Sequence, residues 1–233
     1  TKHTTDFNTS INGIFVFKCT YDGYVELVIT IPVVNIFGTV FLSVSDCLYL
    51  LYSITQSVWF RYNLIIYNKL GAFIDNELII STQTDNNMSI TTIKTDNTQI
   101  FISVDFTGAI TYTDGSSNTS NGDLNINIIE YNLIYDDTII LDPNEIIDTN
   151  STLEFIGSVK IGGSNTDNAC IVQALNDKLY ISGRFTSNPV VFYKSDKTQE
   201  FVLDNPLISN TNIFMCVYPI DFIKNNKNSD LCF

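Results

Sequence analysis

This sequence of 233 residues lacks most of the side chains that enzymes and metal sites depend on. It has one histidine, His3, within a polar N-terminal stretch, and none of its five cysteines forms a Cys-x-x-Cys pair. A catalytic triad needs a histidine beside its nucleophile, and structural zinc sites need closely spaced Cys and His ligands. Nucleotide-binding glycine motifs are also missing, and Gly162-Gly163-Ser164 is typical of a plain turn rather than an anion cradle. We therefore expect no catalytic residues, no cofactor and no metal.

Basic residues are scarce as well. The sequence has 12 Lys and Arg against 25 Asp and Glu, which gives a formal net charge of −13. A surface of this sign repels phosphate backbones, so nucleic acid is excluded as an expected partner. No stretch reaches the roughly 20 apolar residues of a membrane-spanning helix. The first residue is Thr1 and no signal-peptide pattern follows, so we expect either a removed leader or a longer parent product.

Residues that favour β-strands are abundant. Apolar residues make up 45% of the sequence, with 16 Phe and 12 Tyr but only one Trp. Short alternating segments separated by turns follow one another along the whole chain, and an opening hairpin is predicted around Tyr21-Asp22-Gly23. The sequence therefore predicts an all-β fold.

The strands recur in a fixed order. The segments 46–51, 98–103 and 177–182 occupy the same position in successive units, while the loops between them vary in length. Such a pattern is typical of a β-propeller-like array of four-stranded antiparallel blades, here about three full repeats plus a leading strand pair. The last repeat lacks its final strand in this prediction. Closed propellers have at least about four blades, so we expect an unclosed or circularly completed set, a missing neighbouring segment, or an assembly that closes by oligomerisation.

The same pattern gives the expected domain organisation. Residues 1–12 are predicted to be an N-terminal arm, residues 13–223 a single repeat domain, and residues 224–233 a C-terminal tail. The repeat units are placed near residues 13–38, 39–87, 88–141 and 153–223.

The best-preserved unit resembles a bacterial-type β-propeller repeat known as the SBBP repeat. Gly162-Gly163-Ser164, the segment 176–183 and the strand 213–218 follow that repeat's order of glycine turn, Tyr-containing strand and aromatic strand. The composition, rich in Asn, Ile and Tyr, also resembles that of proteins from giant DNA viruses of amoebae. These resemblances imply a structural or interaction protein of a virion or an extracellular surface, with the cytoplasm of an infected host as the alternative location.

Our preferred interpretation is a non-enzymatic propeller-like protein that associates with a protein partner or with itself. The residues proposed for an interaction surface are Trp59, Tyr62, Asp114 and Asp123, and Cys232 is proposed for an intermolecular disulfide. Core packing for the aromatic strand and a solvated loop for the two acids are the alternative interpretations.

A carbohydrate-binding or glycoside-cleaving propeller is the alternative function, since glycosidases need only two suitably spaced carboxylates. Its candidate acids recur in turns: Asp22, Asp136, Asp137 and Asp221.

Overall fold

The structure is a computed structural model, and it confirms that the chain is all-β. It describes residues 13–19, 21–22, 25–32, 41–44, 47–56, 59–68, 73–83, 86, 88–96, 99–134, 152–194, 196–204, 211–225 and 230–232. The expected N-terminal arm and the predicted strand 138–141 lie outside these residues. Within the described part of the chain, no helix is long and apolar enough to cross a membrane.

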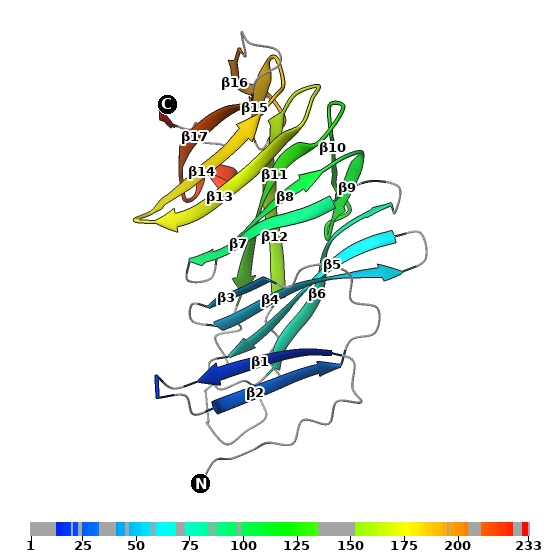
Figure 1. Cartoon of the computed structure of the whole chain (residues 1–233), viewed down its shortest axis with the longest axis vertical. Helices are drawn as coiled ribbons and strands as arrows, with labels where there is room; N and C mark the ends of the chain where they lie inside the picture. The colour runs from blue at the N-terminus through cyan, green and yellow to red at the C-terminus, as the bar shows by residue number, and fades with distance from the viewer. Residues whose placement is uncertain are drawn as a thin grey trace.

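All sheets are antiparallel, and three of them follow a two-stranded pair at the N-terminal end (Figure 1). The N-terminal pair consists of β1 (Gly13–Cys19) and β2 (Val25–Pro32). The first sheet has the order β10-β9-β6-β5-β4-β3, built from β3 (Phe41–Val44), β4 (Cys47–Gln56), β5 (Trp59–Asn68), β6 (Phe73–Gln83), β9 (Ala109–Tyr112) and β10 (Ser117–Thr119).

The central sheet has the order β16-β15-β12-β11-β8-β7, built from β7 (Met88–Asp96), β8 (Gln99–Phe106), β11 (Asn125–Ile134), β12 (Thr152–Gly162), β15 (Val190–Tyr193) and β16 (Gln199–Leu203). The C-terminal sheet has the order β13-β14-β17-β18, built from β13 (Asp167–Leu175), β14 (Lys178–Phe185), β17 (Asn212–Pro219) and β18 (Asp230–Cys232). A short helix, α1 (Phe222–Asn225), follows β17.

Two hairpins are exchanged between neighbouring sheets. The chain leaves the central sheet after β8, forms the hairpin β9–β10, and pairs β9 with β6 of the first sheet before it returns to β11. In the same way it leaves the C-terminal sheet after β14, forms β15–β16, and pairs β15 with β12 of the central sheet. Each of these hairpins therefore covers the outer edge of the sheet that precedes it.

The central sheet is buried on both faces. Along β8, Ile100, Ile102 and Val104 face the first sheet in one apolar core, whereas Phe101 belongs to a second core shared with the C-terminal sheet. Seven of the eight residues of β8 are accordingly buried, while β14, covered on one face, shows strict alternation of buried and more exposed residues. The three sheets thus stack face to face.

The equivalent segments proposed from the sequence occupy equivalent strands. They fall on β4, β8 and β14, and each of these is the second strand of its sheet along the chain. The number of strands differs from the expectation, because the exchanged hairpins raise two of the sheets to six strands. The segment 155–161, which we assigned to the third repeat, lies in β12 and pairs with β11 of the central sheet.

Other strand predictions need correction for local reasons. The sequence suggests two short strands, 58–62 and 64–67, but the structure has one continuous strand, β5, with a register shift between Tyr62 and Asn63. The strands β10, β16 and β18 were not predicted, and β10 lies in a segment, Ser117–Thr119, that contains no apolar residue. The expected C-terminal tail contains β18, whose pairing with β17 supplies the strand that the last repeat had lacked.

Candidate functional site: a basic pocket between two hairpins

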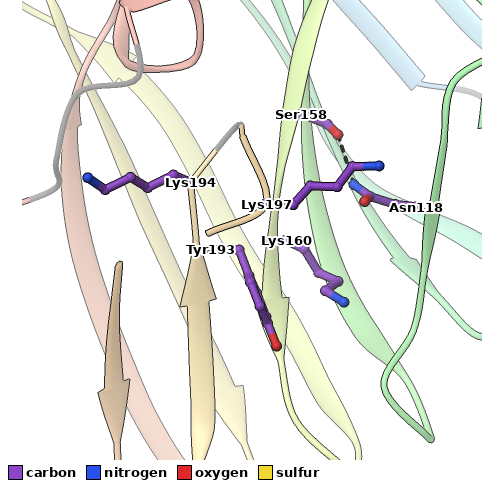
Figure 2. A pocket seen from close by; sticks show the side chains of 6 residues that line it. All are labelled: Asn118, Ser158, Lys160, Tyr193, Lys194 and Lys197. Atoms are coloured by element: carbon purple, nitrogen blue, oxygen red, sulfur yellow. Dashed lines mark hydrogen bonds between the residues drawn. The ribbon is translucent and has the colours of Figure 1, made fainter. Parts of the chain in front are cut away.

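A pocket of about 80 Å³ opens where the two exchanged hairpins approach β12. Its lining residues come from three places: Asn118 from β10, Ser158 and Lys160 from β12, and Tyr193, Lys194 and Lys197 from the β15–β16 hairpin. Figure 2 shows these six side chains; the ammonium group of Lys194 points away from the other five. Three of the 12 basic residues of this acidic chain therefore line one small cavity, and no carboxylate lines it within the described part of the chain.

Lys160 and Lys197 tie the two hairpins together. Lys197 Nζ donates to the Ser117 carbonyl at 3.0 Å, and Lys160 Nζ donates to the Thr119 carbonyl at 3.0 Å and to Asn121 Oδ1 at 2.8 Å. Both carbonyls belong to β10, the outermost strand of the first sheet. The two lysines therefore cap polar backbone groups of an edge strand, a position where charged side chains also discourage pairing with another chain.

The aromatic wall of the pocket holds Lys160 in place. Its Nζ lies 4.6 Å from the centroid of the Tyr193 ring, and Tyr193 Oη accepts a hydrogen bond of 2.8 Å from Asn121 Nδ2. Burial lowers the pKa of the Lys160 ammonium, and the nearby charge of Lys197 lowers it further. Both effects disfavour the charged form of Lys160.

Under the pocket, its lining residues Asn118 and Ser158 belong to a cluster of four polar side chains, the floor, together with the buried Tyr112 and Asn127. Tyr112 Oη accepts hydrogen bonds from Asn127 Nδ2 at 2.6 Å and Asn118 Nδ2 at 3.0 Å, and it shares a hydrogen bond of 3.0 Å with Ser158 Oγ. Asn118 Nδ2 is also 3.0 Å from Ser158 Oγ, the contact drawn as a dashed line in Figure 2. Burial raises the pKa of Tyr112 to about 12, so its hydroxyl stays protonated at neutral pH. The cluster joins β9 and β10 to β11 and β12, and so fixes the floor between two sheets.

Removing the hydroxyl at the centre of this floor should destabilise the fold. We expect Tyr112→Phe to lower the free energy of unfolding by about 1–3 kcal/mol, because the buried amides of Asn118 and Asn127 lose a common acceptor and Ser158 loses a hydrogen-bond partner. Urea unfolding followed by circular dichroism measures the change. Tyr180→Phe, on a half-exposed tyrosine of β14, is the matched control and should change stability by less than about 0.5 kcal/mol. Equal effects of the two variants would contradict a structural role for the cluster.

The glycine turn at Gly162-Gly163-Ser164 surrounds a carboxylate of the chain itself. Asp167 is fully buried and accepts hydrogen bonds from the Gly163 N–H at 2.8 Å, the Thr186 and Ser187 N–H groups at 3.2 Å, and Ser187 Oγ at 2.6 Å. A Cβ on Gly163 would lie 2.4 Å from the Pro189 carbonyl oxygen, so only glycine fits there. The donors that could have cradled an external anion are therefore used inside the protein.

The residues that the sequence suggested for an interaction surface lie in different environments. Tyr62 is buried in the core, where its hydroxyl bonds the Met88 carbonyl and the Ile90 N–H, so it presents no surface. Trp59 is half-buried on β5. Asp114 is exposed and accepts hydrogen bonds from Ser116 within its own turn, and Asp123 is exposed and accepts one from Thr166. Asp114 is thus engaged in a local turn, and Asp123 in a contact between segments far apart in sequence.

The remaining candidates stay predictions. Asp136 and Asp137 lie outside the described residues. Asp22 lies in the turn after β1, and Asp221 lies between β17 and α1. The pair β1–β2 and the C-terminal sheet are at opposite ends of the fold (Figure 1). The backbone of Cys232 on β18 pairs with that of Met215 on β17. The Cys232 side chain lies outside the described ones, so the intermolecular disulfide is still to be tested.

Sequence reasoning missed the basic pocket, because its residues come from three separate segments. The available signal was the concentration of lysine within Tyr193-Lys194-Ser195-Asp196-Lys197 in a chain poor in basic residues. Comparison with known proteins adds no assignment: no protein-family model matches the sequence, and no curated protein or solved structure matches it.

Proposed function

We propose that this chain is a non-enzymatic structural protein whose sheets are blades of a propeller-like array, and that its partner is another copy of the same chain. Without the exchanged hairpins, the strand orders are β3-β4-β5-β6, β7-β8-β11-β12 and β13-β14-β17-β18, which supports one four-stranded unit repeated three times. The face-to-face stacking of the sheets also supports this proposal.

The observation that carries the proposal is the outer edge of β18. In the first and central sheets, the fourth strand of the unit is covered by a hairpin from the following unit. In the C-terminal sheet no described residue pairs on the outer side of β18. Such an edge is a template for another strand. The edge has three residues, and the exchanged hairpins attach through only three and two residue pairs, so its length is sufficient.

A second copy offers a suitable hairpin for this edge. The N-terminal pair β1–β2 forms a sheet by itself among the described residues, with the two-stranded form of the exchanged hairpins. Docking of β1–β2 on β18 of the next copy gives a head-to-tail contact, which closes into a ring or extends as a filament. Repeated contacts of this kind build shells and fibres, including components of virions.

Edge variants on β18 test this assembly. Successive N–H groups of a strand point to opposite sides, so one of Leu231→Pro and Cys232→Pro should remove an outward N–H and leave the pairing with β17 intact. We expect particles of two or more chains for the unaltered protein by light scattering. One proline variant, and a chain lacking residues 1–32, should give single chains.

The control is the thermal midpoint, which should stay unchanged in the proline variant that loses assembly. A protein that remains a single chain of 26.2 kDa at every concentration would overturn the proposal. The same conclusion would follow if both proline variants assembled normally.

A further inference from the structure

The pocket between the two hairpins has features of a binding site that the proposed assembly does not use. We infer that it binds a small tetrahedral oxyanion, the phosphate or sulfate group, with Lys160 and Lys197 as its charged partners and Ser158 as a hydrogen-bonding partner. The geometry of the cavity, its charge and its remaining donors support this inference in turn.

The size of the cavity fits an oxyanion. A single water needs a cavity of on the order of 15 Å³, so a volume of about 80 Å³ has room for one central atom with its oxygens and little more. A sugar ring would not fit inside it. The pocket opens to solvent beside the exposed Lys197, so the organic part of a phosphate or sulfate ester could remain outside.

The donors that face this space are not exhausted. An ammonium group carries three N–H bonds. Lys160 has two protein acceptors and keeps one N–H for a ligand, and Lys197 has one protein acceptor and keeps two. Ser158 Oγ accepts from Asn118 Nδ2 and shares a hydrogen bond with the Tyr112 hydroxyl; when Tyr112 donates in that bond, the Ser158 O–H is available to a ligand.

The charge balance favours an anion over a neutral ligand. The pocket is lined by three lysines and no acid, in a chain whose net charge is −13. Lysine acts as a compact point charge toward phosphate oxygens, and a half-buried position strengthens such contacts. A bound oxyanion would supply the countercharge between Lys160 and Lys197 that no described lining residue provides.

Isothermal titration calorimetry at low ionic strength tests the site, with sodium phosphate, sodium sulfate and phenyl phosphate as probes and sodium acetate as the carboxylate comparison. We expect saturable binding of the tetrahedral probes and at least tenfold weaker binding of acetate. Phenyl phosphate binding at least as tightly as inorganic phosphate would identify an ester as the source of the group. Tighter binding of inorganic phosphate or sulfate would identify the free ion.

Variants of the lysines assign the binding to this pocket. Lys197→Met and Lys160→Met should each weaken phosphate binding at least tenfold, whereas Lys194→Met should weaken it less than threefold because its ammonium group points away. Lys197 is exposed, so its replacement is compatible with folding, and a circular dichroism spectrum equal to that of the unaltered protein verifies this. Lys197→Arg should retain binding.

A second measurement reads the site without relying on affinity. The pKa of the Lys160 ammonium, followed by NMR, should rise when phosphate is added. Absence of saturable phosphate and sulfate binding would overturn the inference, as would equal weakening by all three methionine variants or acetate binding as tight as phosphate. None of these outcomes bears on the assembly through β18.

Discussion

Asp167→Ala is expected to destabilise the protein by about 4–5 kcal/mol, the largest effect of any single substitution considered. The change removes the acceptor of four hydrogen bonds, and it leaves the Gly163 and Ser187 N–H groups without this acceptor in a buried site, whereas the Thr186 N–H keeps the Thr166 carbonyl at 3.2 Å. Each buried donor without a partner costs about 1–3 kcal/mol. Urea unfolding followed by tryptophan fluorescence or circular dichroism measures the loss of stability.

Asp123→Ala is the matched control for this result. Asp123 lies near the same turn and accepts a hydrogen bond from Thr166, but it is exposed, so its replacement should change stability by about 0.5 kcal/mol or less. The stability of Asp167→Asn should lie between those of the two alanine variants. The amide oxygen can still accept some of the four hydrogen bonds, but the NH₂ group would face N–H donors that it cannot accept from. Similar stabilities of Asp167→Ala and Asp123→Ala would refute the role given to the buried carboxylate.

The stability of the protein should fall as the pH rises from about 4 to about 6, because the buried carboxyl group of Asp105 ionises in this range. This residue on β8 accepts hydrogen bonds from Asn168 Nδ2 and from the Ala169 N–H of β13, both at 3.0 Å, and so links the central and C-terminal sheets. Burial raises the pKa of its carboxyl to about 6, although these bonds and the charge of Arg184 oppose the rise.

Because this pKa is higher in the folded protein than the ordinary 3.8, the folded state holds the proton more tightly than the unfolded chain. The stabilisation is therefore complete below about pH 4 and is lost as the pH rises through about 6. A pKa difference of about 2 corresponds to at most about 3 kcal/mol.

Asp105→Asn isolates this effect. The asparagine cannot ionise, and its amide oxygen can still accept from the Ala169 N–H, so the variant should lack this part of the pH dependence. Urea unfolding at a series of pH values measures the difference between the two proteins, and Asp204→Asn, on an exposed acid, is the control. Parallel curves for Asp105→Asn and the unaltered protein would show that Asp105 does not carry the effect.

The strands that were predictable from the sequence are those whose side chains are packed. On β14, Leu179 and Ile181 alternate with more exposed positions, and on β17 the buried Phe214 and Cys216 do the same, so periodicity was sufficient. The segment Ser117–Thr119 gave no such signal. It is a strand because its backbone pairs with β9, and because Lys160 and Lys197 bond its outer carbonyls.

The pocket could not be predicted because its geometry depends on hairpin exchange. Lys160 and Lys197 are far from Asn118 in sequence, and no local pattern states that β9–β10 and β15–β16 leave their own sheets. Asp105 and Asp167 are similar cases: each reads as an ordinary turn or strand-end acid, and only the neighbouring sheet or turn makes it a buried acceptor.

The exchange of hairpins also determines when each sheet can be finished as the chain leaves the ribosome. β6 ends at Gln83, but the first sheet gains its last strand only when Thr119 has emerged, after β7 and β8 have been made. The central sheet likewise gains its last strand, β16, only when Leu203 has emerged, although β12 ends at Gly162. The first and central sheets are therefore not autonomous folding units, and loss of the central or the C-terminal sheet withdraws the edge cover of the sheet before it. Such coupling should make the unfolding of these three sheets cooperative, to a greater degree than in repeats whose neighbours share only a packing interface.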